Sequence, residues 1–242
     1  MLGESAGVTY QPVRRESVVG QVFASLRDAV LSGELAPGDA LPAERELAAR
    51  FGVNRQAVRE AVSRLAQVRL VRVSQGTGTR VEDWRHTAGL DVAAQLAGSA
   101  DRLAVATLTR DMLEMRAVIG ADAARLCAER ADDAARAAVT ASAADYARLG
   151  PDLDALAATN VELWRAVVLG SRNVVYLLSF NSLVGHALAV SPVPPTRRTA
   201  ELLDVPGHLR LAEHIAAGSG DEAFAQAQQL LGRSVAALDG RF

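Results

Sequence analysis

Residues 42–59 read PAERELAARFGVNRQAVR, and this stretch decides the fold of the first third of the chain. Its centre, Gly52-Val53-Asn54, predicts a tight turn that ends in an N-cap. The Asn54 side chain can accept a hydrogen bond from the free N–H groups at the start of the next helix. The stretch therefore predicts two short helices joined by a turn, over residues 43–51 and 55–67.

The flanking residues complete a recognisable pattern. Residues 18–32 place apolar side chains at helical spacing, so they predict a helix ahead of the first pair. Residues 70–73 and 79–81 read as two short strands, and the intervening SQGTG (74–78) allows a tight hairpin. Three helices closed by a two-stranded hairpin form a winged helix-turn-helix, which we assign to residues 18–82.

The remainder of the chain predicts helices only. Residues 83–100 read as a linker with one short helix. Residues 101–242 keep a helical period that glycine and proline interrupt, which predicts a bundle of six or seven helices for effector binding and dimerisation. Residues 1–17 are polar and predict a flexible arm. The chain has 47 alanines, the best helix former, so the predicted fold class is mainly α.

The second helix of the opening stretch carries side chains that suit base recognition. A helix-turn-helix places the N-terminal end of its second helix in the major groove. Arg55 and Arg59 have the fork of donors that binds guanine, and Gln56 can bind adenine in the same bidentate way. Arg45 and Asn54 are better placed for phosphates. A single exposed arginine is more often a solvated charge, but the turn, the cap and the hairpin together predict DNA contact.

The charge balance limits the kind of DNA binding. All 26 basic residues are arginine, and 28 acidic residues give a formal net charge of −2, which excludes a strongly basic chromatin-coating protein. Residues 1–85 carry 12 arginines and 10 acidic residues, whereas residues 86–242 carry 14 and 18. The first part is only weakly basic, so we expect binding to depend on a few well-placed groups and on dimer geometry.

Other classes of protein are disfavoured. Cys127 is the only cysteine, so neither an intramolecular disulfide nor a cysteine zinc cluster is possible, and a cytoplasmic setting is expected. The N-terminus has no apolar secretory segment, and no run of about 18 apolar residues predicts a membrane span. The chain has no Ser/His/Asp set, glycine-rich phosphate loop or paired-carboxylate motif, so we expect it not to be an enzyme.

Two parts of the chain resemble a known family. LPAERELAARFGVNRQAVREAVSRLAQVRLVRVSQGTGTRV (41–81) resembles the DNA-binding domain of the GntR family of bacterial transcription regulators. EMRAVIGADAARLCAERA (114–131), TNVELWRAVVLGSRN (159–173) and HLRLAEHIAAGSGDEAFAQA (208–227) are similar to helices of the ligand domain in its FadR-type branch. The resemblance implies a homodimer on an inverted-repeat, double-stranded operator. The family's DNA contacts would fall on Arg45, Asn54, Arg55, Gln56, Arg59, Gln75 and Gly76.

Many members of this branch hold a divalent metal with one Asp and three His. The first two ligands lie four apart on one helical face, and the matching residues here are Asn160 and Trp164. The third ligand position falls on His208, and the fourth falls near Gly232–Ser234, where there is no histidine. Three of the four expected ligands are missing, so we expect no metal cofactor.

The metal-free pattern resembles the fatty-acid-responsive FadR regulators. It implies an apolar effector, a fatty acid or a long-chain acyl-CoA, whose carboxylate or thioester head could pair with Arg116. The stretch LLGRSVAALDGRF (230–242) contains Asp239 and Phe242 but lacks the pattern of acidic, aromatic and lysine residues expected for an acyl-CoA site. Alternatives are a small carboxylate effector, or a helical domain that only dimerises and whose apolar residues form its core. The predicted pocket consists of Arg116, Val118, Trp164, Val168, Leu177 and Leu178.

Overall fold

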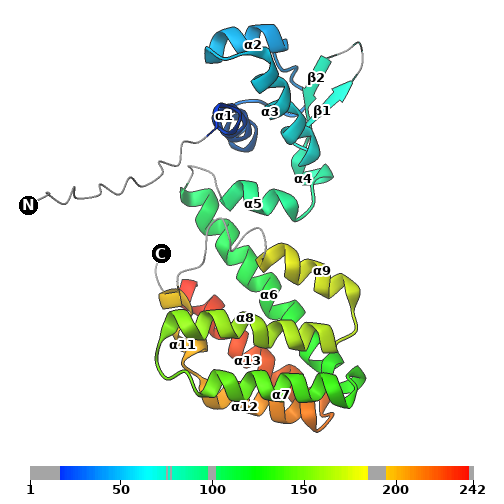
Figure 1. Ribbon diagram of the computed structural model, residues 1–242, viewed down its shortest axis with the longest axis vertical. Helices are drawn as coiled ribbons and strands as arrows, with labels where there is room; N and C mark the ends of the chain where they lie inside the picture. The colour runs from blue at the N-terminus through cyan, green and yellow to red at the C-terminus, as the bar shows by residue number, and fades with distance from the viewer. Residues whose placement is uncertain (1–16, 75, 77, 98–101, 185–194, 240–242) are drawn as a thin grey trace, which may run out of the picture. The chain divides into compact units, whose positions relative to one another are not determined.

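The computed structural model forms two compact units, residues 1–88 and residues 89–242. The division falls inside the region that the sequence predicts as a linker. The structure describes residues 17–74, 76, 78–97, 102–184 and 195–239 (Figure 1).

The N-terminal unit is a winged helix-turn-helix, as the sequence predicts. Most of the predicted arm lies outside the described residues, but Ser17 caps the first helix by accepting the Gly20 N–H at 3.0 Å. The short helix α4 was not predicted, and Asp83 caps it. The elements in chain order are α1 (Val18–Ser32), α2 (Glu44–Phe51), α3 (Arg55–Gln67), β1 (Val71–Ser74), β2 (Gly78–Val81) and α4 (Trp84–Thr87).

The apolar faces of α1 and α3 pack against each other and form the centre of this unit. Apolar side chains recur every three or four residues along both helices, so each helix presents one continuous stripe to the core. The polar side chains of α3 therefore remain on its outer face. The buried members of the two stripes are Val22, Leu26 and Val30 of α1 and Ala57, Val58, Ala61, Val62 and Leu65 of α3.

The hairpin is fastened to the body of the unit by a third segment. β1 and β2 pair antiparallel, with Val71 opposite Val81. On the other edge of β2, the Leu41 N–H donates to the Thr79 carbonyl and the Val81 N–H donates to the Asp39 carbonyl, both at 2.9 Å. These backbone bonds anchor the base of the hairpin next to the start of α2.

The C-terminal unit is a helical bundle. Helix α13 packs along α6, and α7 packs against both α8 and α12 (Figure 1). The fold class and the expected number of helices are confirmed for the residues that the structure describes. The elements are α5 (Asp91–Ala97), α6 (Arg102–Arg130), α7 (Asp133–Ala147), α8 (Leu153–Gly170), α9 (Val174–Ser182), the 3₁₀ helix η2 (Pro195–Arg198), α11 (Thr199–Leu202), α12 (Val205–Ala216) and α13 (Gly220–Asp239).

Small residues let the helices of the bundle approach closely. Ala121, Ala124 and Ala128 of α6 are buried in its main core. Gly170 ends α8 against α6, where an added Cβ would lie 2.4 Å from Sγ of Cys127. Cys127 is fully buried, and this burial raises the pKa of its thiol to about 11. None of the helices in the described part of the chain is long and apolar enough to span a membrane.

Candidate DNA-binding face and ligand pocket

The turn between α2 and α3 sets the exposed end of α3. Gly52 takes a left-handed conformation (φ 65°), which glycine adopts without steric cost, and it ends α2. Asn54 then accepts the Ala57 N–H at 2.8 Å, the N-cap bond that the sequence predicts. Because Ala57 and Val58 turn inward, the neighbouring side chains at the start of α3 face solvent.

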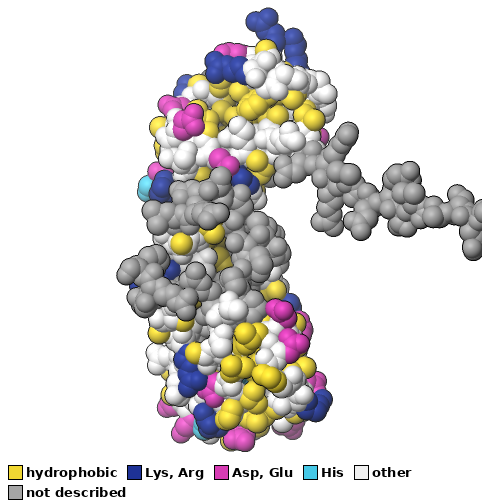
Figure 2. Space-filling model, turned by 90° about the vertical axis from the view of Figure 1, so that its left-hand side faces the viewer, with side chains coloured by type: hydrophobic (Ala, Val, Ile, Leu, Met, Phe, Trp, Pro, Cys, Tyr) yellow, Lys and Arg dark blue, Asp and Glu magenta, His cyan; other side chains and the backbone are white. Residues whose placement is uncertain are grey.

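The predicted DNA contacts that the structure describes all lie on the surface. Arg55, Gln56 and Arg59 lie within the first five residues of α3, and Arg45 lies on α2. Gly76 is at the tip of the hairpin with φ 86°, and Gln75 lies outside the described residues. Figure 2 shows arginine side chains projecting at the end of this unit that carries α2. This arrangement suits a helix that enters a groove while a wing approaches the backbone.

One partner on this face was not predicted from the sequence. The guanidinium of Arg59 forms an ion pair with Glu44, with Nη2 of the arginine 3.1 Å from Oε2 of the carboxylate. The hydrogen bond from Arg59 to Glu44 raises the pKa of the guanidinium. By contrast, Arg55 forms no ion pair with any residue that the structure describes. In the absence of DNA, therefore, Arg59 is held by a carboxylate, whereas Arg55 is not held by any described residue.

The C-terminal unit contains a mostly apolar pocket of about 570 Å³, a volume that includes its open mouth. Its polar side chains come from four separate elements, α6, α8, α9 and η2. A few polar groups on an apolar wall are typical of small-molecule sites. The lining residues are Arg116, Ile119, Gly120, Asn160, Val161, Trp164, Val168, Ser179, Phe180, Leu183, Val184 and Arg198.

Half of the predicted pocket residues line this pocket. Arg116, Trp164 and Val168 do, although they come from two different helices. Leu177 packs against the main core instead. Val118 and Leu178 do not line it, and these residues are 72% and 60% exposed. Val118 lies two positions beyond Arg116, about 200° around the helix, so the two side chains leave α6 on opposite faces.

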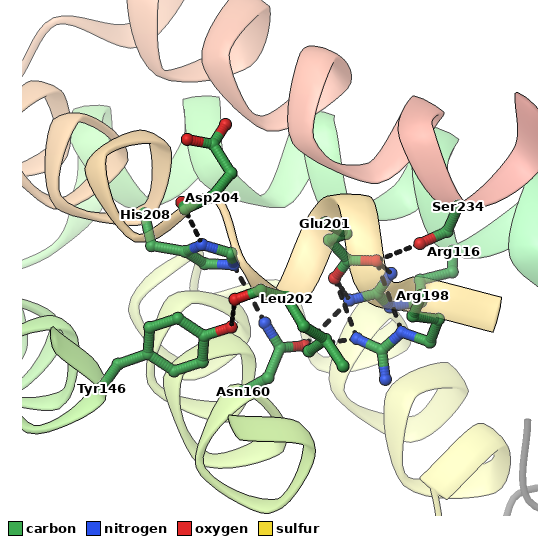
Figure 3. A network of polar contacts seen from close by, with 9 residues as sticks. All are labelled: Arg116, Tyr146, Asn160, Arg198, Glu201, Leu202, Asp204, His208 and Ser234. Carbon is green, nitrogen blue, oxygen red and sulfur yellow. Dashed lines mark hydrogen bonds and ion pairs between the residues drawn. The ribbon is translucent and has the colours of Figure 1, made fainter. Parts of the chain in front are cut away.

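A fully buried carboxylate, that of Glu201, organises one end of the pocket (Figure 3). Arg116 donates to both of its oxygens, at 2.6 and 2.9 Å, and Arg198 donates to Oε1 at 2.8 Å. The Ser234 hydroxyl also donates to it. Burial alone would raise the pKa of Glu201, but the charges of the two arginines outweigh this effect and hold it well below its usual range.

Asn160 links this cluster to His208. Its side-chain oxygen accepts from Arg116 at 3.1 Å and from Arg198 at 2.6 Å, so its amino group points the other way. That amino group donates to Nε2 of His208 at 3.0 Å, and Nδ1 of His208 donates to the Asp204 carbonyl at 2.9 Å. These bonds define the neutral Nδ1–H tautomer, and burial lowers the pKa of His208.

The residues at the family's metal position do not fit a metal. The nitrogen of His208 that would face the ion is occupied by the Asn160 amino group. Two guanidinium groups, those of Arg116 and Arg198, lie against the other side of the same amide and would repel a cation. Within the described parts of the chain, no three His, Cys, Asp or Glu side chains gather closely enough to hold one.

Sequence reasoning missed Arg198 and Glu201. Arg198 lies in η2 and Glu201 lies in α11, and both elements are too short for helical periodicity to give a signal. The sequence does contain a local signal for this pair. Arg198 and Glu201 have opposite charges and lie three residues apart, a spacing that allows an ion pair, next to a helix rich in apolar residues. Their common partner Arg116 lies 85 positions away from Glu201, and only the folded chain shows it.

The fold and the two sites define a transcription regulator with a winged helix-turn-helix and a separate helical domain. Residues 19–81 match the model for bacterial regulatory proteins of the gntR family, and residues 111–233 match that for the FCD domain. The chain belongs to this family of regulators, which are not enzymes.

Similar proteins agree with this assignment. The HTH-type transcriptional regulator Mce2R of Mycobacterium tuberculosis is 34% identical over 91% of both chains. The fatty acid metabolism regulator protein of Edwardsiella ictaluri is 30% identical over 72% of this chain and 70% of its own. A solved structure of Lar, which controls expression of the Listeria monocytogenes agr system, shares the fold with a TM-score of 0.58 and 15% identity, covering 95% of this chain and all of the other.

Proposed function

We propose that this protein binds an inverted-repeat operator as a homodimer in the bacterial cytoplasm, and that a metal-free, acyl-type effector in the helical domain sets its operator affinity. The observation that carries the proposal is the apolar pocket with Arg116 and Arg198 at one end. An apolar wall suits a hydrocarbon tail, and a basic end suits an oxygen-bearing head group. Relatives described as fatty acid metabolism regulator proteins support the same class of effector.

A second hollow supports a long rather than a compact effector. It is lined mainly by apolar side chains, including Leu90, Leu108, Met112 and Met115, and it shares Leu183 with the first pocket. A tail that passes Leu183 would therefore remain in an apolar environment. Methionines suit such a path, since their flexible side chains adapt to different tails.

The second hollow also suggests how an effector would act. Two of its lining residues, Leu90 and Ala93, lie in or next to α5, which begins three residues after the N-terminal unit ends at Ala88. An effector shifts an equilibrium only if it binds two arrangements with different affinity. We propose that the tail changes the packing of α5 and thereby the placement of the DNA-binding units.

The metal-free part of the proposal rests on the contacts of Asn160. In the family's metal sites a carboxylate occupies this position, but here a neutral amide joins two arginines to His208. The dimer part rests on the size of α3, which spans 13 residues and can read only a few base pairs. Two copies on a two-fold site supply the remaining specificity.

Fluorescence anisotropy with an operator duplex and a scrambled duplex tests the proposal. We expect Arg55→Ala to weaken operator binding by about fivefold to hundredfold and to relax sequence preference. Arg64→Ala, on the later part of α3 and paired with Glu60, is the matched control and should retain preference. Specific binding that survives in the Arg55→Ala, Arg59→Ala double variant would contradict the assigned face.

The same assay tests the effector. Dodecanoate or dodecanoyl-CoA should change the operator dissociation constant of the full-length chain. If neither acyl ligand changes it but a short carboxylate such as citrate does, the effector is of the small-carboxylate class. If none of the three has an effect, the helical domain serves dimerisation only, and the acyl proposal is wrong.

A further inference from the structure

We infer that the pocket selects its effector by a free carboxylate group, which Arg116 and Arg198 bind on the side that faces away from Glu201. This inference rests on the proposed function and deepens it, because it distinguishes a fatty acid from its neutral derivatives and from acyl-CoA. It follows from charge balance, from the direction of the donors and from one unused donor in the pocket wall.

The charges of the cluster do not balance. Arg116 and Arg198 carry two positive charges, whereas Glu201 supplies one negative charge. The nearest further carboxylate in the network, Asp204, already forms an ion pair with Arg233 at 2.7 Å. His208 is neutral in its hydrogen-bonded state. One positive charge is therefore left without a counter-charge, although Arg198 is only 9% exposed. Buried charges are costly unless they are paired, so an anion would be favoured here.

The surplus charge faces the pocket. Both arginines line the pocket, whereas Glu201 does not and lies behind them. One amino group of Arg198 points away from Glu201 and Asn160 (Figure 3), and it has no hydrogen-bond partner in the described part of the chain. Because Nη1 of Arg198 carries two N–H groups and makes none of these bonds, a second carboxylate can accept from it without displacing Glu201.

A second residue in the pocket wall, Trp164, also has a donor that is unpaired within the described residues. Trp164 is 4% exposed, and its indole N–H has no partner among the described residues. The same side chain lines the pocket, and its ring lies 5.7 Å from the guanidinium carbon of Arg116. The oxygen of Asn160 is already occupied by the two arginines. A ligand head group at this end therefore meets guanidinium donors and positive charge. The oxygen of an ester or alcohol can accept a hydrogen bond, but only a carboxylate also balances the charge.

Calorimetry on the full-length protein tests this with a matched set of ligands: dodecanoate, dodecanol, methyl dodecanoate and dodecanoyl-CoA. The tail is the same in all four, so differences report the head group. We expect dodecanoate to bind at least tenfold more tightly than dodecanol and the ester. Equal affinity for the acid and the alcohol, or binding of the CoA thioester without binding of the acid, would overturn the inference and leave the proposed acyl effector intact. Binding of none of the four would overturn both.

Variants of Arg198 distinguish a role in ligand recognition from a role in folding. Arg198→Gln should weaken dodecanoate binding by about tenfold to hundredfold and leave dodecanol binding unchanged, because only the acid uses the charge. Arg198→Lys keeps the charge but loses the fork, so we expect an intermediate affinity for dodecanoate. Arg148→Gln, an exposed arginine outside the pocket lining, is the control. An equal loss for the acid and the alcohol in both Arg198 variants would assign Arg198 a structural role only and contradict the inference.

Discussion

Asn160 donates its side-chain amide to Nε2 of His208 at 3.0 Å, while its oxygen accepts from Arg116 and Arg198. This contact joins two helices, α8 and α12, and defines the orientation of both side chains. It also converts the position of a metal ligand in the family into the link between a histidine and an arginine pair. Several testable properties of the helical domain follow from this contact and from the packing around it.

The first prediction concerns the protonation of His208. In Asn160→Asp, the new carboxylate still accepts from the arginines but has no hydrogen to donate to Nε2. The imidazole then gains a proton to form that bond, so the pKa of His208 should rise from its lowered value. NMR titration of the ring measures this. Asn181→Asp, on the exposed face of α9, should leave His208 unchanged, and an unaltered pKa in Asn160→Asp would refute the assigned contact.

Stability should fall in mild acid because of the same histidine. The pKa of His208 is lowered by burial, so the unfolded chain takes up a proton near pH 6.5 that the folded chain does not. The stabilisation is complete above that pH and decreases as pH falls, by at most about 1.4 kcal/mol per pH unit for one proton. Urea unfolding between pH 7.5 and 5.5 should show this slope in the wild type and in His214→Gln. His208→Gln should reduce it, and an unchanged slope would show that other groups cause it.

Glu44 should limit binding to unrelated DNA. Its carboxylate holds Arg59 at 3.1 Å and adds negative charge to a face that approaches phosphates. Glu44→Gln releases Arg59, so we expect binding to scrambled DNA to tighten by about twofold to fivefold, with a smaller gain on the operator. Glu60→Gln, which breaks the Arg64 pair on the same helix, is the control. Weaker operator binding in Glu44→Gln would show instead that Glu44 orients Arg59 for its base contact.

Close packing between α6 and α8 should make Gly170 intolerant of a side chain. A Cβ there would lie 2.4 Å from Sγ of Cys127, so Gly170→Ala should destabilise the protein by about 1–3 kcal/mol. Removing the sulfur in Cys127→Ala should recover part of this loss, which a double-mutant cycle in urea measures. Gly232→Ala on α13 meets nothing within 4 Å and should be neutral or stabilising. Additive effects at 170 and 127 would contradict the contact.

The winged helix-turn-helix could be predicted almost completely from the sequence. Its helices depend on local signals, such as the Gly52 turn and the Asn54 cap, and those signals operate over a few residues. The exposure of Arg55, Gln56 and Arg59 follows from helical period alone. The Glu44 contact does not, since it joins residues on two helices whose angle depends on packing.

Less of the ligand pocket than of the DNA-binding unit could be predicted from the sequence. The sequence predicts that Asn160 and Trp164 stand where metal ligands would be expected, because residue types at a known spacing carry that information. It could not separate Trp164 and Val168, which line the pocket, from Leu178, which is exposed. All three are equally apolar, and only the packing of the helices decides which of them meets a cavity.

The cluster of Arg116, Arg198 and Glu201 forms only when the helices pack together. These residues lie on α6, η2 and α11, and no periodicity connects them. Burial then gives the cluster its chemical character, because an unbalanced charge that water would screen at the surface remains available to a ligand inside the bundle. Local sequence signals therefore suffice for the DNA-binding fold, whereas the basic end of the pocket exists only once the bundle has folded.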